Sequence, residues 1–151
     1  MQQLDEPLLE LDRFAHGIPH DRIEALRAEG ERLARRWQID IALDLCPVPA
    51  AIGKETALCL FRVAQEALNN VIRHAGASAA KVTLRSMDDG LLLAVHDDGS
   101  GFDVQRVAGD HLGLASMRER VRLVDGTFDI ESAPGQGTSI VAWLPAEDGE
   151  P

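Results

Sequence analysis

Five polar side chains in the middle of the chain combine types that could do phosphate or metal chemistry: Glu66, Asn69, Asn70, Arg73 and His74. At about 100° per residue, a helix would place all five on one face, opposite an apolar stripe. Two successive asparagines are poor helix formers, which a plain surface would not require. An amide oxygen suits Mg²⁺, which takes one or two protein ligands besides phosphates and water, and a nearby glutamate can orient or deprotonate a nucleophile. A solvated helix surface is the alternative that these residues alone leave open.

Glycine-bearing loops follow this helix at residues 97–102, 109–114 and 135–138. In the first loop, Gly99 and Gly101 permit positive φ and a close approach of the backbone to a ligand. Asp97, at the end of an apolar strand, could accept a hydrogen bond from an amine such as that of adenine. The second loop leads into a helix N-terminus, which is a natural phosphate site. Each loop alone is also typical of an ordinary turn, and neither a Walker phosphate loop nor a Rossmann glycine pattern is present.

The hydrophobic pattern predicts the elements that must position these residues. Apolar residues recur at helical spacing over about residues 21–37, 54–75 and 114–124. They alternate as in strands over residues 39–45, 81–85, 91–97, 128–130 and 140–144. Turn signals at 88–90 and 134–137 predict two hairpins, one at each turn. The pattern predicts an α+β domain with a mixed, mostly antiparallel sheet and helices on one face.

Two of the predicted helices have a well-defined apolar face. The stripe of the central helix consists of Ala57, Leu60, Phe61, Ala64, Leu68, Val71 and Ile72. In the first helix the residues that recur on one face, and are therefore expected to be buried, are Ile23, Leu26, Leu33 and Trp37.

Composition limits the class of protein. The 151 residues suffice for one compact domain and are too few for two ordinary ones. The formal net charge of −10 argues against general nucleic-acid binding and against docking on an anionic membrane. The longest apolar runs are far shorter than the roughly 20 residues of a membrane helix, and no leader pattern opens the chain. Cys46 and Cys59 form no disulfide framework, so we expect reduced thiols in a cytoplasmic protein.

The order and spacing of these motifs resemble the ATP-binding domain of bacterial sensor histidine kinases. Residues 65–75 resemble the N box, 97–102 and 109–117 the two glycine boxes, and 135–138 the closing Gly-x-Gly-Thr. The resemblance covers about residues 37–145 and is strongest to the nitrate-sensor-like class, whose response regulators carry a helix-turn-helix. It implies a Bergerat fold, a two-layer α/β sandwich that binds ATP between helix and sheet under a mobile lid.

The resemblance also implies roles for individual residues. Asp97 would accept the adenine amino group, with support from Thr138 through water, and Asn70 would ligate Mg²⁺. Glu66 would be the acid/base residue. The lid would span about residues 103–111. The positions expected to contact the nucleotide are Asn69, Asn70, Arg73, His74, Asp97, Gly99, Gly101, Phe102, Gly109, His111, Leu112, Gly113, Leu114, Gly137 and Thr138.

The resemblance suggests a division of the chain. Residues 1–20 would be the end of a dimerisation-domain helix or a linker, 21–145 the catalytic domain, and 146–151 a disordered acidic tail. His20 precedes an aspartate, as a phosphoacceptor does, but it follows Pro19 and leaves no room for two long helices before Glu66. The accepting histidine is therefore expected on a dimerisation helix absent from this chain.

The expected partners are that histidine-bearing helix, a second copy of the full-length kinase and a response regulator, without nucleic acid or membrane contact by this domain. The alternative is a stand-alone serine kinase of the anti-sigma-factor type, which shares the fold. A third possibility is a degenerate nucleotide-binding module used only for interaction. The helical lead-in at residues 1–19 favours the sensor kinase over the serine kinase, and the intact glycine boxes disfavour the degenerate module.

Overall fold

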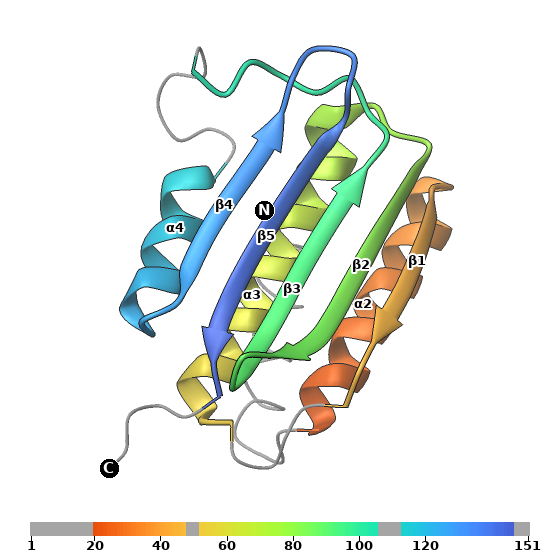
Figure 1. Cartoon of the computed structure of the whole chain (residues 1–151). Coiled ribbons are helices and arrows are strands. Elements are labelled where there is room, and N and C mark those ends of the chain that lie inside the picture. The colour runs from red at the N-terminus through yellow and green to blue at the C-terminus, as the bar shows by residue number, and fades with distance from the viewer. Residues whose placement is uncertain (1–19, 48–51, 106–112, 147–151) are drawn as a thin grey trace.

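The computed structural model describes residues 20–47, 52–105 and 113–146, which form a two-layer α/β domain (Figure 1). The elements in chain order are α2 (His20–Trp37), β1 (Asp40–Leu45), α3 (Lys54–Asn70), the π-helix η1 (Val71–Ala75), β2 (Ala79–Met87), β3 (Gly90–Asp97), α4 (Leu114–Leu123), β4 (Thr127–Ser132) and β5 (Thr138–Pro145). Apart from η1, the types and order of these described elements confirm the sequence-based prediction.

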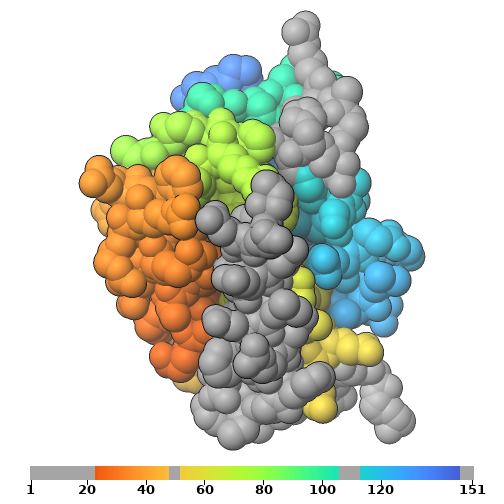
Figure 2. All heavy atoms as spheres, turned by 180° about the vertical axis from the view of Figure 1, so that it is seen from behind, coloured from red at the N-terminus to blue at the C-terminus, as the bar shows by residue number. Residues whose placement is uncertain are grey.

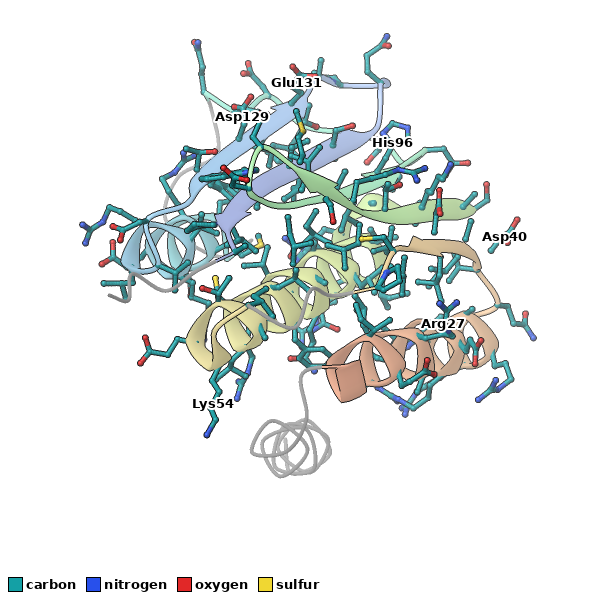
Figure 3. All side chains as sticks on the ribbon, turned by 60° about the horizontal axis from the view of Figure 1, so that its bottom comes forward. Arg27, Asp40, Lys54, His96, Asp129 and Glu131 are labelled. Carbon is teal, nitrogen blue, oxygen red and sulfur yellow. The ribbon has the colours of Figure 1, made fainter. Side chains whose placement is uncertain are left out.

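The described strands form one five-stranded sheet in the order β1-β2-β3-β5-β4. β1 pairs with β2 in parallel, and the other neighbouring pairs are antiparallel. The helices cover one face of this sheet, as Figures 1 and 3 show. In Figure 3 the labelled side chains of His96, Asp129 and Glu131 lie on the sheet side of the molecule, and Lys54 lies on the helix side. The predicted mixed, mostly antiparallel sheet with helices on one face is thus confirmed.

The core lies between the sheet and the helices because alternate strand residues point toward the helix layer. From the middle of the sheet, β3 contributes Leu91, Leu93 and Val95, and β5 contributes Ile140, Ala142 and Leu144. The apolar stripe of α3 packs against them, and Phe61, Leu60 and Leu68 are at most 2% exposed. The face of α2 that carries Leu26 and Leu33 closes the core beside β1.

Trp37 was expected on the buried face of α2, and this expectation is wrong, because the residue is 52% exposed. It is the last residue of the helix, and the next residue, Gln38, turns the chain with a φ of +55°. The indole ring therefore lies beyond the helix packing, where the guanidinium of Arg36 stacks 5.4 Å from its centroid.

The periodicity predicts an α-helix through the whole of the central segment, but the structure departs from this at the end of the helix. After Asn70 it widens into η1, and it terminates at Gly76 in the left-handed conformation. A π-turn holds one more residue than an α-turn, and such turns are frequent at functional sites. The change therefore falls within the cluster of polar residues singled out by the sequence.

Within the described part of the chain, no helix has both the length and the apolar character that crossing a membrane would require.

Candidate functional site

A pocket with about 430 Å³ of empty space, open solvent included, lies between the end of the central helix and the adjoining ends of β3 and β5. Its apolar wall comes from α3, η1, the sheet and the start of α4. Four polar residues converge on it: Asn70, His74, Asp97 and Thr138. The complete lining is Ala67, Asn70, Val71, His74, Ala75, Val95, Asp97, Gly101, Phe102, Leu114, Ile130, Thr138 and Ile140. An apolar pocket with a few convergent polar groups is the usual form of a small-ligand site.

Asp97 is the buried charged group of this pocket. It is the last residue of β3 and only 5% exposed, and its Oδ1 accepts a hydrogen bond of 2.8 Å from the Gly99 N–H. Burial raises the pKa of its carboxyl above the ordinary value, and hydrogen bonds from the backbone N–H groups of Gly99 and Thr138 partly oppose that rise. A carboxylate held in apolar surroundings is placed to accept hydrogen bonds from a ligand.

The glycines of the first and last loops let three backbone segments meet at the rim of this pocket. Gly101 has a φ of +68°, and a Cβ there would overlap the carbonyl oxygen of Ala133. Gly137 has a φ of +75°, and a Cβ there would overlap the carbonyl oxygen of Asp97. The requirement for glycine is therefore both conformational and steric at these two positions.

Two residues that the sequence analysis did not single out hold these loops in place. The hydroxyl of Ser132 contacts Phe102, Gly137 and Thr138. The carboxylate of Asp98 accepts hydrogen bonds of 3.0 Å from the N–H groups of Ser78 and Ala79, and these bonds lower its pKa. An aspartate before a glycine is a common acceptor for loop backbone, so Asp98 carried a recognisable signal, whereas Ser132 did not.

A second, larger cavity lies on the helix side between α2, α3 and α4, with an empty volume of about 1590 Å³. Figure 2 views the molecule from this side, with α2 in orange on one flank and α4 in cyan on the other. The predicted residues that line this groove are Glu66, Asn69 and Arg73. Its other lining residues are Glu29, Arg32, Leu33, Arg36, Trp37, Arg62, Gln65, Ile72, Ser116, Met117 and Arg120.

The polar face of the central helix is therefore divided between two cavities. Asn70 and His74 line the Asp97 pocket, while Glu66, Asn69 and Arg73 line the groove. Both cavities reach α4, since Leu114 lines the pocket and Met117 lines the groove. Glu66 lies against the start of this helix, because a Cβ on Gly113 would come within 2.5 Å of the Glu66 Oε2. Gly113 has a φ of +71° and caps the start of α4. A helix start offers unpaired N–H groups and a positive dipole end, which favour phosphate.

The other predicted site residues are placed as follows. Gly101, Phe102 and Leu114 line the Asp97 pocket, and Gly99 and Gly137 lie in the loops at its rim. Gly109, His111 and Leu112 lie outside the described residues, as does most of the predicted lid.

The side chains at this site suit a magnesium ion only if a phosphate ligand completes its coordination. Among residues 20–47, 52–105 and 113–146, no group of three or more His, Cys, Asp or Glu side chains could hold a metal ion. Mg²⁺ commonly takes one or two protein oxygens and completes its shell with phosphates and water. The amide of Asn70, at the pocket, fits that requirement.

Comparisons with known proteins agree on the family. The sequence model for "Histidine kinase-, DNA gyrase B-, and HSP90-like ATPase" matches residues 55–148. The chain is 38% identical to sensor histidine kinase LiaS of Bacillus subtilis over 123 residues, 80% of this chain and 34% of LiaS. It is 42% identical to sensor protein VraS of Staphylococcus aureus over 86 residues, 57% of this chain and 25% of VraS. It thus spans about a third or less of the length of these curated relatives.

Solved structures show the same fold at low sequence identity. A histidine kinase domain from the blue-light activated histidine kinase of Erythrobacter litoralis superposes with a TM-score of 0.68 at 20% identity, over 83% of this chain and 63% of that one. The mycobacterial sensor histidine kinase MprB gives a TM-score of 0.64 at 22% identity, over 83% and 94% of the two chains. The chain belongs to the histidine kinase-, DNA gyrase B- and HSP90-like ATPase family.

Proposed function

We propose that this chain binds Mg-ATP in the Asp97 pocket and is the catalytic part of a sensor histidine kinase of the nitrate-sensor-like class. The observation that carries the proposal is the nearly buried Asp97 carboxylate in an apolar pocket, between the Asn70 helix and the glycine loops. A flat base with an exocyclic amine matches such a pocket, because the apolar walls favour the ring and the carboxylate accepts a hydrogen bond from the amine N–H.

Each residue then has a task that its position supports. Asp97 accepts a hydrogen bond from the adenine amino group, and the apolar side chains of Val95, Leu114 and Ile140 contact the base. Asn70 ligates Mg²⁺, which neutralises phosphate charge when bound. His74 lines the same pocket and offers a ring nitrogen to the phosphates, and Arg73, on the same helix end but on the groove side, adds positive charge near them.

Glu66 lies outside the base pocket, in the groove beside the start of α4. We assign it the acid/base role for the accepting histidine, since a groove open to a partner is where an incoming side chain would meet it. The γ-phosphate would pass to a histidine on the dimerisation helix of the homodimeric kinase, and from there to a response regulator with a helix-turn-helix. The similarity of this chain to LiaS, a sensor histidine kinase, and to VraS, a sensor protein, supports this partner set over a serine kinase.

Calorimetric titration of ATP with Mg²⁺ into the 151-residue chain tests the proposal. We expect saturable binding, which Asp97→Asn weakens about 10- to 150-fold, because a hydrogen bond to a charged group is worth about 1.5–3 kcal/mol. The matched control is Asp129→Asn, the same change on an exposed residue of β4 outside the pocket. Unchanged affinity in the Asp97 variant would refute the adenine assignment.

A further inference from the structure

The hydroxyl of Ser132 joins the loops around the Asp97 pocket. Its Oγ accepts a hydrogen bond of 2.9 Å from the Phe102 N–H and lies 3.0 Å from the carbonyl oxygen of Gly137. It also lies 2.8 Å from the Thr138 Oγ1. Ser132 is the last residue of β4 and half-buried, and it does not line the pocket itself.

These three contacts determine where the protons lie. A serine hydroxyl has one proton to donate and can accept two hydrogen bonds. The carbonyl of Gly137 can only accept, so Ser132 donates its proton there, while the Phe102 N–H can only donate to Ser132. The contact with Thr138 is then a hydrogen bond only if Thr138 is the donor. The hydroxyl proton of Thr138 therefore points toward Ser132 and away from the pocket. The Thr138 Oγ1 is then available to a ligand in the pocket as a hydrogen-bond acceptor.

Sheet register places this acceptor beside the Asp97 carboxylate. Asp97 on β3 is the register partner of Thr138 on β5, and Thr138 is the partner of Ser132 on β4. Residues in one such row share a face of the sheet. Asp97 and Thr138 both line the pocket, whereas Ser132 stands behind Thr138. The row thus presents two neighbouring acceptors to a ligand.

We infer that Ser132 is a positioning residue that makes Thr138 an acceptor, so that the pocket selects a purine with an exocyclic amine over one with a carbonyl there. The contact from ligand to Thr138 is direct or passes through a water that donates to it. A purine carbonyl would meet two acceptors and no donor, which leaves its oxygen desolvated and without a hydrogen bond. The inference rests on the proposed nucleotide-binding function and adds the basis of base selection.

The test is the ratio of affinities for ATP and inosine triphosphate, which carries a carbonyl in place of the adenine amine. We expect the wild-type chain to bind ATP more tightly than inosine triphosphate. Ser132→Ala should lower this affinity ratio about tenfold, because the released Thr138 hydroxyl can then donate a hydrogen bond to the carbonyl. Ser132→Thr keeps a hydroxyl and should retain the preference. In a Thr138→Val background, Ser132→Ala should no longer change the ratio.

The ratio separates positioning from a merely structural role. If Ser132→Ala only loosens the loops, both affinities fall together, the ratio stays at the wild-type value, and the inference is overturned. Ser139→Ala, which removes a hydroxyl bonded to His96 outside the pocket, is the matched control and should leave both affinities unchanged. If the wild-type chain binds neither nucleotide, the proposed function fails and this inference with it.

Discussion

Asp97 and Asp98 are adjacent residues whose environments shift their carboxyl pKa values in opposite directions. Burial raises the pKa of Asp97, whereas hydrogen bonds from Ala79 and Ser78 lower the pKa of exposed Asp98. In the unfolded chain both are ordinary aspartates. The ionised form of Asp97 therefore disfavours the ligand-free fold, and the ionised form of Asp98 favours it.

The pH dependence of stability should show these opposite signs. For Asp97, the folded state binds the proton more tightly, so its destabilising effect is full above the raised pKa and disappears as the pH falls below it. For Asp98, the folded state binds the proton less tightly, so its stabilising effect is present above the unfolded value of 3.8 and is lost as the pH falls through the lower folded value. Urea unfolding of the wild type, Asp97→Asn and Asp98→Asn from pH 7 to pH 3 measures both.

On lowering the pH, the stability of the wild type relative to Asp97→Asn should rise, while its stability relative to Asp98→Asn should fall. Each variant serves as the control for the other, because all remaining titrations cancel in the differences. Parallel curves for the two variants would contradict the environments described here.

Asn70 allows a test of the metal assignment by magnesium dependence. Asn70→Ala removes the amide oxygen and should reduce the gain in ATP affinity that Mg²⁺ provides to the wild type, with a smaller effect on titrations in excess chelator. Calorimetry with and without Mg²⁺ measures the two affinities. Equal magnesium dependence in variant and wild type would show that Asn70 is not a ligand.

Residue type explains which site positions the sequence could predict. An aspartate at the end of an apolar strand and glycines in the following loop have few alternatives, so the positions of Asp97 and Gly101 at a pocket were predictable. Ser132 looked like any polar residue before a Pro-Gly turn, because its importance lies in three partners from other segments. Hydrogen bonds between distant segments leave no periodic signal.

At the scale of elements, the sequence predicted which helices and strands form but not their detailed geometry or their positions relative to one another. Strand alternation, helical stripes and turn signals predicted each element, but the widening of α3 into η1 was not predictable from an apolar stripe that continues through Ile72. The division of the polar face between pocket and groove likewise needed the positions of α2, α4 and the sheet.

The loop around Gly101 provides an element-scale prediction with a matched control. Gly101 and Gly135 both have positive φ, at +68° and +80°, but a Cβ at Gly135 would meet nothing within 4 Å. Gly135→Ala should therefore lose only about 1 kcal/mol of stability from backbone strain. Gly101→Ala should lose clearly more, because its Cβ overlaps the Ala133 carbonyl, and should also weaken nucleotide binding. Thermal unfolding and calorimetry compare the two, and equal losses would contradict the close packing of the loops.

At the scale of the whole molecule, the domain extends beyond the family match. The match begins at residue 55, but α2 and β1 precede it and complete both the core and the sheet. Leu26 on α2 is 0% exposed, and Gly30 lets the helix approach Leu43 of β1 closely. We therefore treat α2 as part of the folding unit.

Leu26→Ala should destabilise the entire domain by about 2–5 kcal/mol, as expected for a fully buried leucine. Glu24→Ala, an exposed position on the same helix, should change stability by less than about 0.5 kcal/mol. Urea unfolding followed by far-ultraviolet dichroism measures both. If Leu26→Ala lost only the helical signal of α2 in a separate early transition, α2 would be an independent appendage.

The parallel pairing of β1 with β2 has a consequence for local opening. Two adjacent parallel strands need a crossover connection that returns the chain from one end of the sheet to the other. Here α3 with η1 forms that crossover. The helix that carries Glu66 and Asn70 is thus held at both ends by adjacent strands. Amide hydrogen exchange should therefore show α3, β1 and β2 opening as one cooperative unit. Fraying of the edge strand β1 would loosen the helix beside the pocket, so a partner that clamps this edge would stabilise the pocket from a distance.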